Sequence, residues 1–216
     1  MLGIYALLLW FFVFFRICYL LIRYFKINSI LLRTIFIWTF FNFFVSIWEF
    51  MLLFYYKYVE KKGNYYYENN KCYWTSDVSI SDAFSYKMYM DIYADYSYCD
   101  KRYIKNLIKN EGNRFVLSAE IIHGIFAAIF SIIILTLFFT NSHKIYIYLS
   151  SIIFSSIQFG LIIWYLTTLF MERIFVKNEK EWLPPILWNV PWVLIPIYII
   201  YYSCKIIIPS IIRKKN

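Results

Sequence analysis

The chain has 216 residues, of which 62% are hydrophobic and 24% aromatic, and it contains only five Gly and five Pro. This composition excludes an average soluble domain, a disordered chain and a fibrous protein. The net charge of +9 does not indicate nucleic-acid binding, because the basic residues without acidic neighbours gather in short connections and at the tail. We therefore expect no nucleic-acid partner.

Five apolar segments are long enough to cross a hydrocarbon core, which takes about 20 residues. We expect helices near residues 2–22, 30–56, 115–140, 145–170 and 185–208. The first segment lacks the basic region and cleavage site of a signal peptide, so we expect it to remain a helix. The sequence thus predicts one all-α integral membrane domain over residues 1–216, a five-helix bundle with one long loop over residues 57–114.

Basic residues predict the orientation of this bundle. They flank the first connection, lie in the third and end the chain, without acidic residues among them: Arg23, Lys26, Arg33, Lys144, Arg213, Lys214 and Lys215. The positive-inside rule puts these parts in the cytosol. We therefore expect a lumenal N-terminus, a cytosolic C-terminus and a lumenal loop over residues 57–114. Cys72 and Cys99 share this loop, and whether they form a disulfide is left open.

Two acidic residues, Glu49 and Glu120, fall inside the predicted spans. A charge near the bilayer centre costs about 2.5–3.5 kcal/mol, so an intramembrane carboxylate indicates a function or a buried partner. From the rise of an α-helix, both lie about 9–12 Å inside the lumenal boundary. Polar or aromatic residues of two further spans lie at a similar depth: Tyr165, Thr168, Asn189 and Trp192. Side chains from four helices therefore converge on one level, as in a binding site.

Glu120 and His123 are three positions apart and project from one helical face. Gly124 beside them allows a neighbouring helix or a ligand to approach closely. E-x-x-H also occurs in di-iron bundles, but those need a second such pair and two further Glu, whereas this chain has only two His. We expect no metal site. Acid–base chemistry or recognition of a cation remains, and a purely structural hydrogen bond is an open alternative for His123.

Five stretches, in this order along the chain, carry a family resemblance: W-E-F-M-L-L-F-Y-Y around Glu49, Y-S-Y-C-D-K-R-Y from Tyr96 to Tyr103, F-V-L-S-A-E ending at Glu120, Q-F-G-L-I-I-W-Y-L-T from Gln158 to Thr167, and N-V-P-W-V-L-I-P from Asn189 to Pro196. They resemble the emopamil-binding protein family, which comprises the sterol Δ8-Δ7 isomerases and their relatives with an EXPERA domain, the sigma-2 receptor among them. The resemblance covers most of the chain after about residue 40.

The resemblance implies a five-helix membrane bundle in the endoplasmic reticulum that serves sterol biosynthesis. The family's isomerases move the B-ring double bond by protonating the alkene and then deprotonating the carbocation, without a cofactor. It implies catalytic roles for Glu49, Glu120 and Asn189, cation–π stabilisation by Trp192, and a substrate contact by Tyr103. The expected partners are a sterol substrate or an amphiphilic cationic ligand and the lipid bilayer. Homodimerisation is left open.

The sequence also departs from the family pattern. Val45 stands where the isomerases carry a His one turn before the first carboxylate, and His123 stands where they carry a Thr. Thr168 replaces a usual Glu, and the loop over residues 57–114 is longer than usual. Two hypotheses follow. Either His123 restores the acid–base set with Glu49 and Glu120, with Tyr165 and Thr168 touching the substrate, or the chain is a non-catalytic relative that binds sterols or amphiphilic amines.

Overall fold

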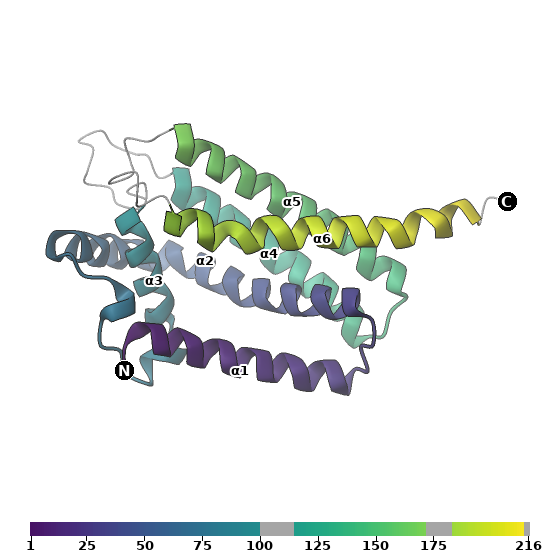
Figure 1. The fold of residues 1–216 in the computed structure, drawn as a ribbon, viewed down its shortest axis with the longest axis horizontal. Helices are drawn as coiled ribbons and strands as arrows, with labels where there is room; N and C mark the ends of the chain where they lie inside the picture. Colours follow the sequence, from purple (N-terminus) through teal and green to yellow (C-terminus); the bar gives the residue numbers. More distant parts are fainter. Residues whose placement is uncertain (100–114, 172–182, 214–216) are drawn as a thin grey trace.

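The protein is an all-helical bundle, seen here in a computed structural model that describes residues 1–99, 115–171 and 183–213. Its helices are α1 (Gly3–Tyr24), α2 (Ile30–Asn69), α3 (Tyr86–Cys99), α4 (Phe115–Phe139), α5 (Lys144–Met171) and α6 (Leu183–Arg213), with two short 3₁₀ turns, η1 (Tyr73–Thr75) and η2 (Asp82–Phe84). The five long helices lie along the long axis of the molecule, whereas α3 lies at one end (Figure 1).

Five of these helices are long and apolar enough to cross a membrane: α1, α2, α4, α5 and α6. The predicted all-α membrane bundle is confirmed, and the five predicted segments agree with these helices. The protein is therefore a multi-pass membrane protein. Much of the outer surface is formed by exposed large hydrophobic side chains, among them Phe12, Phe54, Ile132 and Leu194, because in a bilayer such side chains face lipid rather than water.

The segment predicted as one long loop, residues 57–114, is largely structured where it is described. α2 does not end near residue 56 but continues to Asn69, where Asn70 terminates it in the left-handed conformation. The helix outlasts its apolar stretch because residues 57–69 contain no Pro and only one Gly. We call residues 70–99 the cap, since η1, η2 and α3 fold back onto the end of the bundle near α1 and α2.

The cap is fixed to the start of α1 by backbone contacts. Leu2 forms an antiparallel bridge with Asp77, and the Gly3 N–H donates to the Ser76 carbonyl at 3.0 Å. A Cβ atom at position 3 would collide with the Tyr73 carbonyl oxygen, so glycine allows this close approach. α1 therefore begins against the cap rather than at a free end.

Around this end of the bundle, aromatic rings join the cap to the spanning helices. Tyr89 of α3 stacks on Trp48 of α2 at 3.7 Å between ring centroids, and Trp74 stacks on Trp188 of α6 at 5.3 Å. α4 packs mainly between α2 and α5, and α5 packs along α6. These elements surround a cavity, which holds the candidate site.

Candidate functional site

A cavity of about 410 Å³ lies inside the bundle beneath the cap. All five spanning helices and the cap contribute to its wall, which is mostly apolar and aromatic. The polar and charged side chains of the wall are Glu49, Asp95, Glu120, His123, Gln158 and Asn189, with the tyrosines Tyr89, Tyr93, Tyr96 and Tyr165. No Lys or Arg lines it among the residues that the structure describes. The described wall therefore favours a largely apolar ligand with a neutral or cationic polar group.

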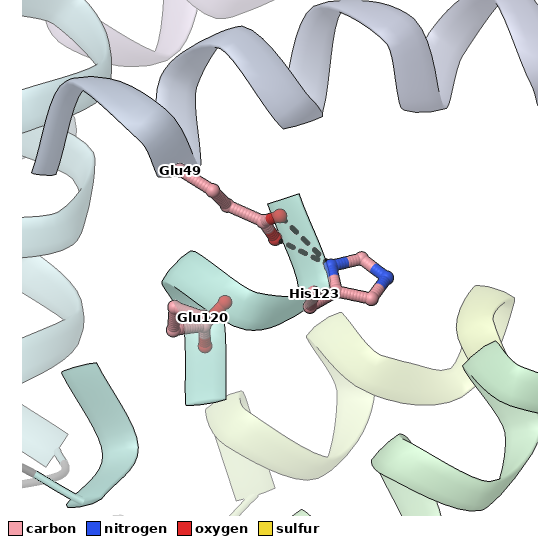
Figure 2. A group of neighbouring side chains, drawn as sticks. All are labelled: Glu49, Glu120 and His123. Carbon is pink, nitrogen blue, oxygen red and sulfur yellow. Dashed lines mark hydrogen bonds and ion pairs between the residues drawn. The ribbon is translucent and has the colours of Figure 1, made fainter. Parts of the chain in front are cut away.

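The centre of the site is a contact between α2 and α4. His123 Nδ1 lies 2.9 Å from Glu49 Oε1 and 2.8 Å from Oε2, and Figure 2 shows the imidazole pointing at this carboxylate with Glu120 beside it. Glu49 is only 3% exposed. The buried carboxylate thus has the partner that an intramembrane charge requires.

One turn of α4 brings Glu120 to the same place. One oxygen or nitrogen atom from each of Glu49, Glu120 and His123 lies within 4.8 Å of the others. The two carboxylates, which were predicted to lie at a similar depth, therefore meet in one cluster. They meet because Glu120 and His123 share one face of α4 and His123 contacts Glu49. The same spacing is compatible with a bound metal ion, so the expectation of no metal site stays a prediction.

Gly124 sets how closely α4 approaches α2. A Cβ atom at this position would lie 2.8 Å from Glu49 Cβ and 3.3 Å from the Ser46 carbonyl oxygen. Only a residue without a side chain allows this separation, because real Cβ atoms do not approach so closely. The close helix approach predicted at Gly124 is confirmed, and the neighbour is α2.

This chain has an apolar residue, Val45, at the position where the family's isomerases are expected to carry a His. Val45 is buried and lines the cavity one turn before Glu49. His123 enters from α4 instead and reaches the same carboxylate. The hypothesis that the imidazole has moved between helices therefore agrees with the geometry, whereas its catalytic role stays a prediction.

Asn189, Tyr165 and Trp192 also line the cavity. The Asn189 side-chain amide donates to the Tyr96 hydroxyl at 2.9 Å, and this hydroxyl lies 2.9 Å from that of Tyr165. Trp192 packs edge-on against Trp38 at 5.4 Å between ring centroids. α6 presents Asn189 and Trp192 although it contains Pro191 and Pro196, and Tyr165 comes from α5. Pro196 leaves the Trp192 carbonyl without its helical N–H partner.

One predicted contact, Thr168, is not part of the described wall, and another lies outside the described residues. The Thr168 hydroxyl donates to the Tyr165 carbonyl at 2.9 Å, and Thr168 is not among the residues that line the cavity. The Thr168 side chain bonds within α5 because a Thr hydroxyl can donate to a backbone carbonyl one turn earlier in its own helix. Tyr103 lies outside the described residues, as does the side chain of Cys99; Cys72 is a free cysteine whose Sγ lies 3.2 Å from Thr75 Oγ1.

Sequence reasoning missed the residues behind His123 and those in the cap. Gln158 and Asn42 are buried amides, and Gln158 Nε2 lies 3.4 Å from His123 Nε2. Tyr93 and Asp95 of α3 line the cavity from the cap. A buried amide in an apolar span is a signal of the same kind as a carboxylate, although weaker, and it could have pointed to Asn42 and Gln158. The cap residues gave no such signal, because their segment reads as polar loop.

The two cap residues have perturbed proton affinities. Burial, followed by the nearby Glu49 and Glu120, raises the pKa of Tyr93 well above its usual value, so its phenol stays protonated. Burial raises the pKa of Asp95 to about 6, although hydrogen bonds from the Tyr73 N–H and the Trp74 side chain oppose the shift. The Tyr73 N–H donates to Asp95 Oδ1 at 2.8 Å.

Fold and site together define a multi-pass membrane protein with an internal cavity that combines two carboxylates, an imidazole and aromatic walls. A family model described as EXPERA (EXPanded EBP superfamily) matches residues 87–203, more than half of the chain. The chain belongs to this family, that of the emopamil-binding protein. The matched part includes Glu120, His123, Gln158, Asn189 and Trp192, whereas Glu49 precedes it. No curated protein and no solved structure matches the chain.

We predict that Gly124→Ala destabilises the protein by about 1–3 kcal/mol, because the added methyl group overpacks the contact between α2 and α4. Gly160→Ala is the matched control, since a Cβ atom there meets nothing within 4 Å; it should be neutral or stabilise α5 by about 0.5–1 kcal/mol. Unfolding in detergent micelles measures both. Equal stability of the two variants would contradict the close contact.

We also predict that the contribution of Asp95 to stability falls as the pH rises from about 4 to about 6. In this window the folded state keeps the Asp95 proton that the unfolded chain, with an ordinary pKa of about 3.9, has lost. The loss of stability caused by the raised pKa of Asp95 in the folded state approaches about 3 kcal/mol above pH 6. Asp95→Asn retains an acceptor for the Tyr73 N–H and should lack this component of the pH dependence. Parallel stability curves for the parent and Asp95→Asn would refute the shift.

Proposed function

We propose that the protein is a sterol Δ8-Δ7 isomerase of the endoplasmic reticulum membrane, with a lumenal N-terminus and a cytosolic C-terminus. The observation that carries the proposal is the 2.8 Å contact between His123 and Glu49 beside Glu120 in a cavity with apolar walls. It supplies the imidazole that Val45 removes from the family pattern. The family match supports a sterol-related ligand.

The reaction adds one proton and removes another. Protonation of the Δ8 alkene at C9 leaves a cation at C8, and loss of a proton from C7 then forms the Δ7 alkene. Glu49, Glu120 and His123 are the groups able to give and take these protons, since a carboxyl and an imidazole exchange protons within hydrogen-bond reach. No cofactor is needed, because the bond shifts without net oxidation.

The cation between the two steps needs stabilisation in a site from which water is excluded. The face of Trp192 can stabilise it, because an aromatic ring attracts positive charge through its quadrupole, and the nearby carboxylates add electrostatic attraction. Asn189, held by Tyr96 at 2.9 Å, orients the sterol or its cation on the α6 side. Tyr165 completes this wall.

We predict that the chain restores Δ7 sterols in a yeast strain that lacks its own sterol Δ8-Δ7 isomerase, measured by sterol analysis. His123→Thr should lower conversion by about 100-fold or more, as expected when a general acid–base group is lost. His143→Asn is the control, because His143 is exposed and immediately precedes α5. No conversion by a well-expressed parent chain would rule out catalysis, and a fully active His123→Thr would make His123 structural.

A second function is favoured by one observation: Val45 lines the cavity where the isomerases carry a His, while both carboxylates and the aromatic wall are retained. Binding needs the cavity but not the proton relay. The alternative is a non-catalytic membrane protein that binds sterols or amphiphilic amines.

For this alternative we predict that a tamoxifen-like amine binds more tightly than its neutral carbinol analogue. Glu120→Gln should lower the ratio of amine affinity to carbinol affinity about tenfold, because a charge-assisted hydrogen bond contributes about 1.5–3 kcal/mol. Competition binding in membranes measures both ligands. An unchanged preference in Glu120→Gln and in Glu49→Gln would exclude a cationic site. Amine binding without sterol conversion would select this function over the isomerase.

A further inference from the structure

Behind His123, three buried side chains form a polar network that has no part in the reaction proposed above. They are Trp38 and Asn42 of α2 and Gln158 of α5, with exposures of 5%, 0% and 1%. In a membrane-spanning segment, buried polar groups cost free energy unless they are hydrogen-bonded. Their hydrogen-bond directions therefore carry information about the group at the end of the network, which is His123.

The direction of each hydrogen bond is fixed by two groups, one of which can only donate and the other only accept. The Trp38 indole nitrogen can only donate, and it lies 2.9 Å from Gln158 Oε1, so the Gln158 oxygen faces Trp38. The Trp38 backbone carbonyl can only accept, and it takes the Asn42 Nδ2 hydrogen at 2.8 Å. The amide orientations of Asn42 and Gln158 are thus determined from both ends.

With these orientations, Gln158 turns its amino group toward His123. One hydrogen of Gln158 Nε2 is donated to Asn42 Oδ1 at 2.6 Å. The second is directed to His123 Nε2 at 3.4 Å. This contact is long, but Gln158 Nε2 can only be its donor. For this contact to attract, His123 Nε2 must be an acceptor and carry no hydrogen.

This condition selects among the proton arrangements of the Glu49–His123 pair. The contact of 2.8 Å to His123 Nδ1 is satisfied by an ionised Glu49 with imidazolium, by a protonated Glu49 with the Nε2–H tautomer, or by an ionised Glu49 with the Nδ1–H tautomer. The first two put a hydrogen on Nε2, directly against the Gln158 amino group. Only the third leaves Nε2 bare.

We infer that Gln158 is a positioning residue that keeps Nε2 of His123 unprotonated, so that the Glu49–His123 pair holds a single proton, on Nδ1. A pair in this state has room for one more proton and acts as an acceptor. If the proposed isomerisation is right, the proton that starts it comes from another group of the site, and Glu120 lies within 4.8 Å of the pair. Only this consequence rests on the proposed function.

The proton positions can be measured directly by ¹⁵N NMR of the imidazole. The chain has two His, so His143→Asn leaves His123 as the only one, and selective ¹⁵N-histidine labelling of the full chain in detergent micelles or nanodiscs needs no further assignment. Near pH 7 we expect a hydrogen-bearing Nδ1 and a bare Nε2. A hydrogen on Nε2 in this parent protein overturns the inference.

Two variants test whether Gln158 is the cause. Gln158→Glu replaces the donor by an acceptor and should put a hydrogen on Nε2. Gln158→Leu has a similar size and removes the donor, so Nε2 should carry a hydrogen in a measurable fraction of molecules. In either variant, an Nε2 that stays fully bare overturns the positioning role.

Ser155→Ala is the matched control on α5. Ser155 is buried one turn before Gln158, and its hydroxyl has no hydrogen-bond partner among the residues described, so the ¹⁵N signals should match those of the parent. The spectra report the proton positions whether or not the protein turns over a sterol. Failure of the complementation assay and failure of this inference are therefore separate results.

Discussion

A carboxylate buried inside a membrane bundle has to be partnered, and most of the site follows from how this chain meets that requirement for Glu49. The partner comes from α4 rather than from the helix that holds the carboxylate. For His123 to reach it, α4 must lie against α2, and Gly124 removes the side chain that would hold them apart. The same turn of α4 brings an oxygen of Glu120 to within 4.8 Å of the pair, so one helix contact assembles all three ionisable groups.

The membrane also explains why the groups around this pair are so strictly oriented. Without water to exchange hydrogen bonds, buried amides keep the partners that the protein provides. An indole N–H and a backbone carbonyl fix the two ends of the network, and the amides between them transmit that polarity to the far side of the imidazole. Neutral side chains can in this way set which nitrogen of a buried imidazole carries a hydrogen, as inferred for His123.

The cap gives the cavity its enclosed end. Stacked pairs of aromatic rings join it to α2 and α6, while Tyr93 and Asp95 bring further ionisable groups to the wall. Burial is the first cause of the raised pKa of each residue.

The sequence by itself determined the class of fold, because five apolar stretches of membrane length allow few other structures. It also predicted the two carboxylates that meet in the cavity, since the helical rise and the cost of a buried charge are local properties. Tertiary structure decided the rest. Helix rotation, which local sequence does not set, decided that His123 meets Glu49 and that Thr168 turns to its own backbone. Folding of the cap onto the bundle decided that residues 70–99 form part of the wall, because long-range aromatic packing leaves no periodic pattern in the segment itself. The roles of Gln158 and Asn42 depend on bonds between α2 and α5, residues more than a hundred positions apart, which only the packed bundle brings together.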